Sequence, residues 1–509
     1  MKGRDKKKIT AASMWLLTGF VLVCSACAFQ QGEATRARRA TPGNARTITV
    51  KSGGQLQRAL DDALPGDELV LDAGATYNGN FKLPITSGDA FITIRSSRCA
   101  ELPAGVRVSP AQAPLMARLA TPNMSPVLLA PPGSHHWRLQ CLEFTQGSSV
   151  KDSGYNLIQL GDGDPTGQQK TLASVPHHLE LDRVIVRARD DKTAVQRGIT
   201  LNSAYTSVTN SYVSGIKWAG VETQAVGGWN GPGPFEIINN YLEASGENIL
   251  FGGATPTISG LVPSDIKIKD NHLFKPLSWR QGDPSFAGTA WTVANLLELK
   301  NARRVEISGN LLENSWPHGQ VGWAVIFNTF RDGGWEVVED VQFVRNTIRN
   351  STNGINLRGL DRGDTALRMR RIKLEDNLIE GLGFSGSEAK AFQLLGGSED
   401  VTINHNTVSG RATHMLIIDA APGFSHRNLV YTNNLLPHGM YGIFGDGGLL
   451  GQEALQRWAS NFTLAKNGMI STPGDLQSKY PRNYFPASSQ EAGRLMGTDN
   501  QPVGVRIKL

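Results

Sequence analysis

Short runs of alternating apolar and polar residues recur through most of the chain and predict β-strands. The clearest copy spans residues 235–253 (FEIINNYLEASGENILFGG). There Phe235 and Ile237 alternate with polar residues, and a polar corner follows at Asn239 and Asn240. Similar phrases recur as IKIKDNHLFKP, VEISGNLLENS, VQFVRNTIRNS, IKLEDNLIEGL and VTINHNTVSG. A phrase repeated at a regular period indicates one solenoid of stacked coils rather than several globular domains.

Asparagine occupies seven successive corners of this repeat. The corners are 28–31 residues apart except for two gaps of 39 and 36 residues, and they are Asn240, Asn271, Asn310, Asn346, Asn377, Asn406 and Asn434. A period of about 30 residues suits three short strands and three turns per coil, and the Leu/Asn consensus of leucine-rich repeats is absent. Asparagine tolerates a left-handed corner, and stacked copies bond to one another, so we expect a structural ladder.

A second strand follows each corner, for example at residues 248–253, 295–301, 324–330 and 354–360. These strands are expected to stack as a parallel sheet. The two longer gaps contain extra loops at residues 281–291 and 331–340. Because insertions in a solenoid fall on one face and commonly build its binding site, the middle of the chain is the region where we look for function.

The two ends of the repeat differ from its middle. Near the start, an amphipathic helix with Leu56 and Leu60 on its apolar face is expected to cap the open end of the first coil. The repeat decays after residue 434, and residues 453–459 predict a short closing helix. We therefore place the solenoid at residues 47–440 and a C-terminal cap and tail, packed on the solenoid, at residues 441–509.

The formal net charge of +6 is concentrated at the N-terminal end. Residues 1–28 carry +4 and residues 29–46 carry +3, which leaves −1 for the rest of the chain. Nucleic-acid binding needs a basic face, so nucleic acid is not among the expected partners. Residues 29–46 lack periodicity and predict a disordered linker.

Residues 1–28 predict an export signal, since a basic start precedes an apolar run too short for a comfortable membrane span. Cleavage after Ala28 would leave Phe29 first. Alternatively, Ser25-Ala26-Cys27 is a lipobox and Cys27 carries a lipid anchor, the one expected contact with a membrane. An uncleaved signal anchor is the third interpretation. We expect an extracytoplasmic bacterial protein, periplasmic, secreted or anchored in the outer membrane, that is a monomer.

Four cysteines are present, and two of them lie in the export signal. The other two are Cys99 and Cys141. An oxidising compartment permits a disulfide between them, and two free buried thiols are the alternative. No Cys/His spacing typical of a metal site appears along the sequence.

The strand–Asn–strand coils, the N-terminal segment with GGQLQRAL and PGDELVL, and the export signal resemble right-handed parallel β-helix proteins of the pectate-lyase-like superfamily. The resemblance covers about residues 47–440. Stretches such as WNGPGPF and GENILFGG most resemble a poorly characterised group of exported bacterial β-helix repeat proteins. It implies an all-β, right-handed parallel β-helix solenoid with a short N-terminal capping helix. It also implies activity on a polysaccharide, because the superfamily includes pectin-, alginate- and chondroitin-degrading lyases as well as hydrolases.

A polysaccharide lyase needs a base for the proton next to a uronate carboxyl, a cation to neutralise that carboxyl, and an acid for the leaving oxygen. In NLLELKN, Glu298 and Lys300 alternate with leucines and are expected to face outward together. Stacked coils would extend this into one polar column, namely Glu247, Asn248, Glu298, Lys300, Asn328 and Arg358. We expect Lys300 as the base and Arg358 as the charge neutraliser. Glu247 and Glu298 are the catalytic orienters or the ligands of Ca²⁺, as the resemblance to chondroitinase-B and alginate lyases implies.

Substrate contacts are expected from aromatic and basic residues near the long loops. Seven of the ten tryptophans lie between residues 218 and 335. Because aromatic faces stack on sugar rings, Trp229 and Trp279 are expected to line a groove with Lys275, Asn328 and Arg331. Two alternatives remain open. One is a glycoside hydrolase that uses paired carboxylates from Glu222, Glu247 and Glu298, and the other is a non-catalytic glycan-binding or envelope-surface protein.

Overall fold

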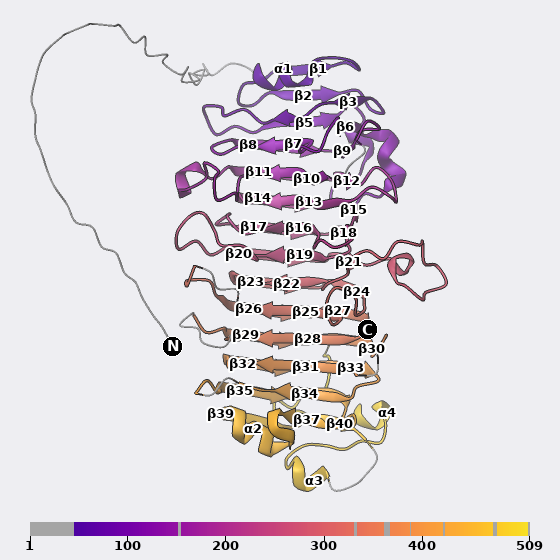
Figure 1. The fold of residues 1–509 in the computed structure, drawn as a ribbon, viewed down its shortest axis with the longest axis vertical. Coiled ribbons are helices and arrows are strands. Elements are labelled where there is room, and N and C mark those ends of the chain that lie inside the picture. Colours follow the sequence, from indigo (N-terminus) through magenta and orange to yellow (C-terminus); the bar gives the residue numbers. More distant parts are fainter. Residues whose placement is uncertain are drawn as a thin grey trace, which may run out of the picture. The chain divides into compact units, whose positions relative to one another are not determined.

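The computed structural model describes residues 45–150, 154–329, 333–360, 367–386, 388–420, 423–471 and 476–506. The predicted export signal with Cys27, nearly all of the linker at 29–46, and Arg331 lie outside these residues. Within them the chain winds through three parallel sheets, one strand per sheet in each coil (Figure 1). The predicted right-handed parallel β-helix with a short N-terminal helix is confirmed.

The first sheet has fourteen strands in chain order, and from β17 to β35 the strand leads directly into the corner asparagine. Its strands are β1 (Thr47–Val50), β2 (Glu68–Leu71), β5 (Ile92–Ser96), β8 (His135–Gln140), β11 (His177–Asp182), β14 (Ala204–Thr209), β17 (Phe235–Ile238), β20 (Ser264–Lys269), β23 (Ala302–Ser308), β26 (Val338–Val344), β29 (Arg370–Glu375), β32 (Glu399–Asn404), β35 (His426–Thr432) and β39 (Ala459–Ala465).

The second sheet has thirteen strands and carries the candidate site on its outer face. Its strands are β4 (Phe81–Lys82), β7 (Leu128–Ala130), β10 (Gly154–Leu160), β13 (Val195–Leu201), β16 (Gln224–Gly228), β19 (Glu247–Phe251), β22 (Leu297–Leu299), β25 (Trp323–Asn328), β28 (Asn353–Arg358), β31 (Lys390–Leu395), β34 (His414–Ile418), β37 (Gly442–Gly445) and the antiparallel β38 (Leu449–Leu450).

The third sheet, also of thirteen strands, lies between the corner that follows the first sheet and the second sheet. Its strands are β3 (Thr76–Asn78), β6 (Ala117–Thr121), β9 (Leu142–Gln146), β12 (Ile185–Arg187), β15 (Tyr212–Ile216), β18 (Tyr241–Ala244), β21 (His272–Phe274), β24 (Leu311–Ser315), β27 (Thr347–Ser351), β30 (Leu378–Leu382), β33 (Thr407–Gly410), β36 (Leu435–Pro437) and β40 (Gly468–Ile470). Because β39 and β40 still pair with the sheets, the coils continue past residue 440, the end predicted from the sequence.

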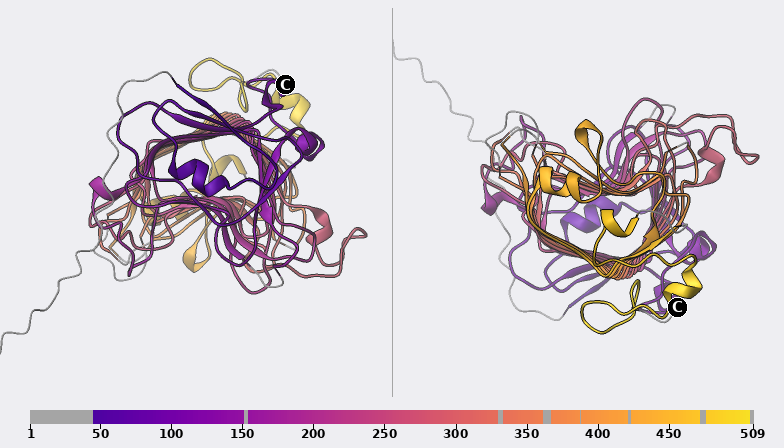
Figure 2. Two further views of the ribbon diagram at one scale, coloured as in Figure 1. Left: turned by 90° about the horizontal axis from the view of Figure 1, so that it is seen from above. Right: turned by 90° about the horizontal axis from the view of Figure 1, so that it is seen from below.

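Helices cover the ends of the stack. Helix α1 (Leu56–Asp61) buries Leu56 and Leu60 and lies across the N-terminal opening, as Figure 2 shows. At the other end lie the predicted closing helix α2 (Gln452–Trp458) and α3 (Leu476–Lys479), followed by α4 (Ser489–Ala492). Short 3-10 turns are η1 (Cys99–Glu101), η2 (Pro110–Leu115), η3 (Leu172–Ser174), η4 (Leu277–Trp279) and η5 (Asp446–Gly448). One apolar core fills the coils from Val50 to Tyr480.

The asparagine ladder is present and longer than predicted. The backbone N–H of each ladder residue donates to the side-chain Oδ1 of the next, from Ser211 through the seven predicted asparagines to Asn467 and Asn483. The left-handed backbone belongs to the residue before each asparagine, such as Asn239 at φ 55°. The expectation that the ladder asparagine itself takes the left-handed corner was therefore wrong, and its selection rests on the stacked amides.

Replacing Asn310 with alanine should destabilise the solenoid by about 2–4 kcal/mol. The change removes the acceptor of the Asn271 backbone N–H and the donor to the carbonyl of Ile268, and both groups are buried. Denaturant unfolding followed by circular dichroism measures the effect. Asn78→Ala, at an exposed position of β3, is the matched control and should change stability by less than about 0.5 kcal/mol. Equal effects of both variants would contradict a structural ladder.

A second column of left-handed residues runs along the first sheet. In ten of its strands the second or third residue has φ between 47° and 60° and bulges outward in register with its neighbours, namely His136, His178, Tyr205, Asp265, Arg304, Asp340, Arg371, Asp400, Asn428 and Asn461. Neighbouring side chains of this column match chemically. Arg304 Nε donates to Asp265 at 2.7 Å, and the His178 ring stacks on Tyr205 at 4.6 Å.

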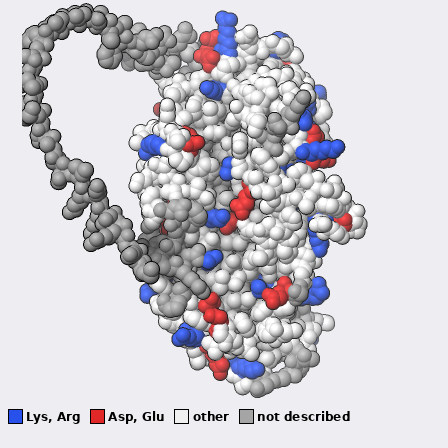
Figure 3. Space-filling model, in the orientation of Figure 1, with Lys and Arg blue, Asp and Glu red and all other residues white. Residues whose placement is uncertain are grey.

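Cys99 and Cys141 form a disulfide that joins η1 to the corner before β9, which settles the alternative left open by the sequence. Within the described ranges, no helix has the length and apolarity that a membrane span requires. Acidic and basic side chains are interspersed over the face shown in Figure 3.

Candidate functional site

A hollow of about 180 Å³ lies on the outer face of the second sheet, across β13, β16 and β19 and the end of β22. Its floor is largely backbone, because Gly227, Gly228, Gly252 and Gly253 supply no side chains there. A Cβ at Gly252, where φ is +92°, would lie 2.5 Å from the backbone nitrogen of Asn301, so this close approach requires glycine. Gly252 and Gly253 therefore leave open space beside Lys300, which lines the same hollow.

Charged and aromatic side chains border this floor. Arg197, Glu222, Trp229 and Lys300 all line the hollow, together with Gln196, Gln224, Leu250 and Ala254. The Arg197 guanidinium lies 5.1 Å from the ring centre of Trp229, and the Trp229 indole N–H donates to the carbonyl of Gly163. Two cations, one carboxylate and one aromatic side chain therefore surround the glycine floor of the hollow.

An ion pair and a chain of hydrogen bonds connect the charged groups. Lys300 Nζ lies 3.6 Å from Glu298 Oε1, and Asn295 Nδ2 donates to Glu298 Oε2 at 3.0 Å. The same Asn295 amide donates to Gln320 Oε1, whose own amide donates to Glu222. Burial alone would lower the pKa of Lys300, but the charges of Glu298, Glu247 and Glu222 outweigh it and raise that pKa. Lys300 is therefore held as an ammonium at neutral pH.

Glu247 lies on the outer side of the same sheet and is fully buried. Gln224, its register partner in the preceding coil, donates to Glu247 Oε2 at 2.8 Å. Burial, reinforced by the charges of Glu298 and Glu222, raises the pKa of Glu247 to about 8. Glu247 Oε1 and Asn295 Oδ1 are both buried and lack a partner in the arrangement described. A proton on Glu247 would turn one of these two acceptors into a donor, which agrees with the raised pKa.

The protonated state of Glu247 should make stability depend on pH. The folded state binds this proton more tightly than the unfolded state, whose pKa is near 4.5, so the contribution is complete below pH 4.5 and is lost as the pH rises towards 8. Glu247→Gln keeps the shape and a neutral group, and should be more stable than the native chain above pH 8 by roughly 3–5 kcal/mol. Urea unfolding at acidic and alkaline pH measures the difference. Glu236→Gln, on the exposed face of β17, should leave the pH dependence as it is.

The sequence predicted one polar column, but in the structure the polar residues of the second sheet form two separate columns. Lys300 follows Leu299, which pairs with Phe327, so Lys300 lies beside Asn328, and Asn328 pairs with Arg358. The structure thus brings these three predicted residues together in register on one face. Arg358 lies two coils from Lys300 and does not line the hollow. The second column consists of Arg197, Gln224 and Glu247, which pair in successive coils.

Three of the predicted site residues have buried side chains, so these predictions were wrong. Lys275 and Trp279 were expected to contact substrate, and Asn248 was expected in the outward polar column. Lys275 is fully buried and its Nζ donates to the carbonyls of Ala244, Ser245 and Gly246 and to Asn248 Oδ1. Burial lowers the pKa of Lys275, and the charges of Glu247 and Glu243 oppose that shift. Asn248 faces inward, where its amide donates to carbonyls of the third sheet.

Trp279 is the second of these contacts. It is 6% exposed and packs with Trp291, Trp316 and Val293 in a separate apolar cluster under the loop at 281–291. Of the tryptophans in the described ranges, Trp229 lines the hollow. The loop therefore contributes packing rather than the aromatic groove that the sequence suggested.

Three residues of the site were missed by the sequence, namely Arg197, Gln224 and Asn295. Each occupies the position that Glu247 occupies in its own coil, immediately before the apolar residues of the second-sheet strand. Aligning the segments QRGITL, TQAVGG, GENILF and ANLLEL would have placed them in one column. The usable signal was the register of the second strand rather than that of the asparagine corner.

Comparison with known proteins gives matches among solved structures alone, since no protein-family model and no curated protein sequence matches the chain. A mannuronic-acid-specific polysaccharide lyase of family 6 from human gut microbiota aligns over 90% of this chain and 96% of its own, at 12% identity and TM-score 0.47. A family 6 polysaccharide lyase from Pseudopedobacter saltans aligns over 92% and 97%, at 13% identity and TM-score 0.43. These similarities are to the fold.

The catalytic domain of a family 87 α-1,3-glucanase is similar to the same extent, with 12% identity, TM-score 0.45, and 85% of this chain and 69% of its own aligned. One fold can host many reactions, so the fold alone does not decide what this chain does. The chemistry of this chain has to be argued from its own hollow.

Proposed function

We propose that the protein cleaves a uronic-acid-containing polysaccharide by β-elimination in the hollow between β13 and β22. The observation that carries this proposal is the pair of cations, Arg197 and Lys300, which line the same glycine-floored hollow as Glu222 and Trp229. A sugar ring can lie flat on backbone and against Trp229, while its carboxylate meets a guanidinium or an ammonium.

Each proton transfer of the reaction has a group at hand. Arg197 neutralises the uronate carboxylate, which makes the neighbouring C–H bond acidic. Glu222 accepts that proton, the bond between the adjacent ring carbon and the glycosidic oxygen breaks, and a carbon–carbon double bond forms. Lys300 donates its proton to the leaving oxygen. Because its raised pKa keeps Lys300 protonated, this role suits it better than that of the base expected from the sequence, and Arg197 replaces the more distant Arg358 as the neutralising cation.

Calcium, expected at Glu247 and Glu298, has no part in the proposed mechanism. Both carboxyl groups are met by nitrogen donors, Gln224 at Glu247 and Asn295 with Lys300 at Glu298. A carboxyl that carries a proton at neutral pH and an ammonium 3.6 Å from the other do not form the oxygen-rich, anionic set that Ca²⁺ selects. Activity should therefore persist after treatment with a calcium chelator.

The proposal is tested by incubating the purified protein with a panel of acidic polysaccharides, including alginate, pectate and chondroitin. Rising ultraviolet absorbance from an unsaturated uronate product supports elimination. New reducing ends without that absorbance would identify a hydrolase and overturn it. Binding without either product would identify a glycan-binding protein. Hydrolysis is the weaker alternative because, among the described residues, Glu222 is the one carboxylate that lines the hollow.

We further propose that the protein acts as a monomer outside the bacterial cytoplasm, in accord with the export signal predicted at residues 1–28. Fractionation of cells that express the full chain tests the location. Labelling with a fatty-acid analogue, with Cys27→Ser as the control, distinguishes lipid anchoring from simple cleavage. Recovery in the cytoplasmic fraction would contradict both routes.

A further inference from the structure

Four histidines from two consecutive coils meet on the outer face of the first sheet. His135 and His136 begin β8, and His177 and His178 begin β11. The strands pair so that His135 lies beside His177, and His136 lies beside His178. This cluster belongs to a different sheet from the hollow, and the proposed function makes no use of it.

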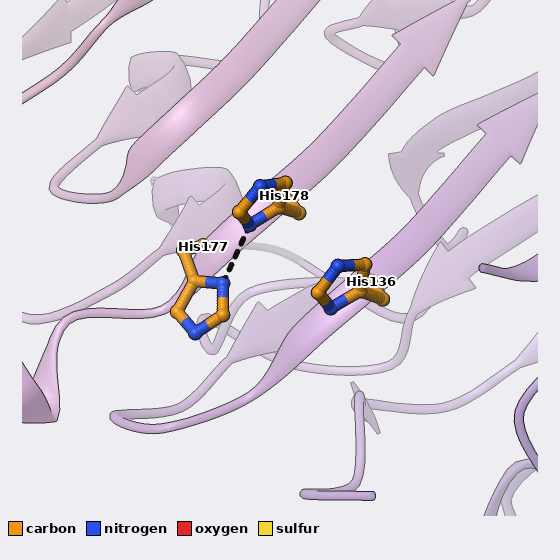
Figure 4. Close-up of side chains that lie close together, drawn as sticks. All are labelled: His136, His177 and His178. Atoms are coloured by element: carbon orange, nitrogen blue, oxygen red, sulfur yellow. Dashed lines mark hydrogen bonds between the residues drawn. The ribbon is translucent and has the colours of Figure 1, made fainter. Parts of the chain in front are cut away.

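The left-handed column explains why both histidines of each pair face the same way. His136 and His178 have φ of 57° and 54°, which interrupts the strand alternation that would otherwise send neighbours to opposite faces. As a result the Nδ1 atoms of His177 and His178 are 2.7 Å apart, and those of His135 and His136 are 2.8 Å apart (Figure 4 draws three of the four). Each coil therefore presents one pair of imidazole rings whose Nδ1 atoms lie close together.

Ring stacking then holds the two histidine pairs against each other. His136 stacks on His178 with ring centres 4.4 Å apart, and His135 stacks on His177 at 4.9 Å. Ligand nitrogens of His136, His177 and His178 all lie within 4.8 Å of one another. Asp89, an exposed carboxylate, exerts its charge on His136 and His177 and adds negative potential beside the cluster.

We propose that His136, His177 and His178 bind a divalent transition metal of the kind that prefers imidazole, such as Zn²⁺, Cu²⁺ or Ni²⁺. With metal–nitrogen bonds of about 2.0–2.1 Å, two ligand nitrogens are separated by about 2.9 Å at a right angle and about 3.3 Å at a tetrahedral angle. The Nδ1 atoms of His177 and His178 need to separate by only a few tenths of an ångström while both rings turn their lone pairs toward the metal, and a rotation of His136 supplies the third nitrogen.

The protons of the cluster are accounted for without any other reactant. In the neutral pair, one Nδ1 carries a hydrogen and donates to the other. Coordination through both Nδ1 atoms requires that hydrogen to move to Nε2 of the same ring. An all-nitrogen set does not suit Ca²⁺, which takes oxygen ligands, so this site and any calcium effect on catalysis are separable.

The test uses the full chain after chelator treatment and dialysis. Zn²⁺ titrated by calorimetry should bind at one ion per chain, and Cu²⁺ should give an electron paramagnetic resonance spectrum with coupling to several imidazole nitrogens. His178→Tyr keeps a ring in the stack, because Tyr205 occupies the same position one coil further on, but it removes a ligand nitrogen. It should weaken Zn²⁺ binding about tenfold or more, and the double variant with His177→Phe should abolish it.

His318→Gln, a change at an exposed histidine outside the cluster, is the matched control and should leave Zn²⁺ affinity unchanged. Absence of stoichiometric Zn²⁺ binding by the native chain, or unchanged binding by the double variant, would overturn the proposal and leave the histidines as a stacking ladder. If the variants fail to fold, the Cu²⁺ spectrum of the native chain decides, since fewer than two coupled nitrogens contradicts the site.

Discussion

Lys300→Gln should lower the rate of unsaturated-product formation by about a hundredfold or more. The substitution keeps a hydrogen-bonding side chain of similar reach but removes the ammonium, and with it the proton for the leaving oxygen and part of the positive charge of the hollow. Loss of a positioned proton donor typically costs a factor of about 10²–10⁴ in rate. The measurement is the initial rate of absorbance increase on the best substrate of the panel.

Lys267→Gln is the matched control for this prediction. Lys267 is an exposed lysine in an ion pair with Glu236 on the first sheet, outside the hollow. Its replacement should leave the rate within about twofold, since exposed pairs contribute little. A Lys300→Gln protein that retains full activity would remove Lys300 from the mechanism. Arg197→Gln should raise the substrate concentration needed for half-maximal rate as well as lower the rate, because Arg197 holds the carboxylate from the bound state onward.

Lys275→Met should destabilise the protein by about 3–5 kcal/mol, although Lys275 lies outside the hollow. Its ammonium is the shared donor to three backbone carbonyls and to Asn248 at the turn before β19. Methionine fills the same space without a donor, so these buried acceptors lose their partner at once. Denaturant unfolding followed by circular dichroism gives the change.

An exposed lysine again provides the control for Lys275. Lys267→Met should change the unfolding free energy by no more than about 1 kcal/mol. If Lys275→Met unfolds at the same denaturant concentration as the native chain, the buried ammonium does not stabilise the turn. A loss of activity in a folded Lys275→Met protein would reflect movement of Glu247, which lies in the strand that this turn begins.

The solenoid could be predicted from the sequence because its determinants are local and repeated. Alternating apolar residues specify each strand, and asparagines such as Asn240 and Asn310 identify the coil period without any knowledge of distant contacts. The pairing of Glu298 with Lys300 followed from strand alternation alone. That pair lies in the middle of β22 and just beyond it, where alternation holds.

Alternation fails where the chain turns from the third sheet to the second. Asn248 and Ile249 are adjacent, yet both are buried toward the inside, whereas Glu247 lies on the outer side of the sheet. The sequence could not show this bend, and it could not show that Lys275 turns inward to stabilise it. Arg197 was missed for a related reason, because the corner asparagine fixes the register of the first and third sheets more directly than that of the second.

Along the left-handed column of the first sheet, the backbone conformation is the same at each position while the type of side chain varies. At these positions the strand pairs with the coils before and after, while most of the side chains reach the surface and contact their counterparts one coil away. Adjacent coils are about 4.8 Å apart, so the column is a row of regularly spaced groups that is interrupted at β17. Ring stacks, ion pairs and amide pairs already occupy different segments of it. An engineer could therefore substitute a chosen series of charged, aromatic or metal-binding side chains along this column without redesigning the core.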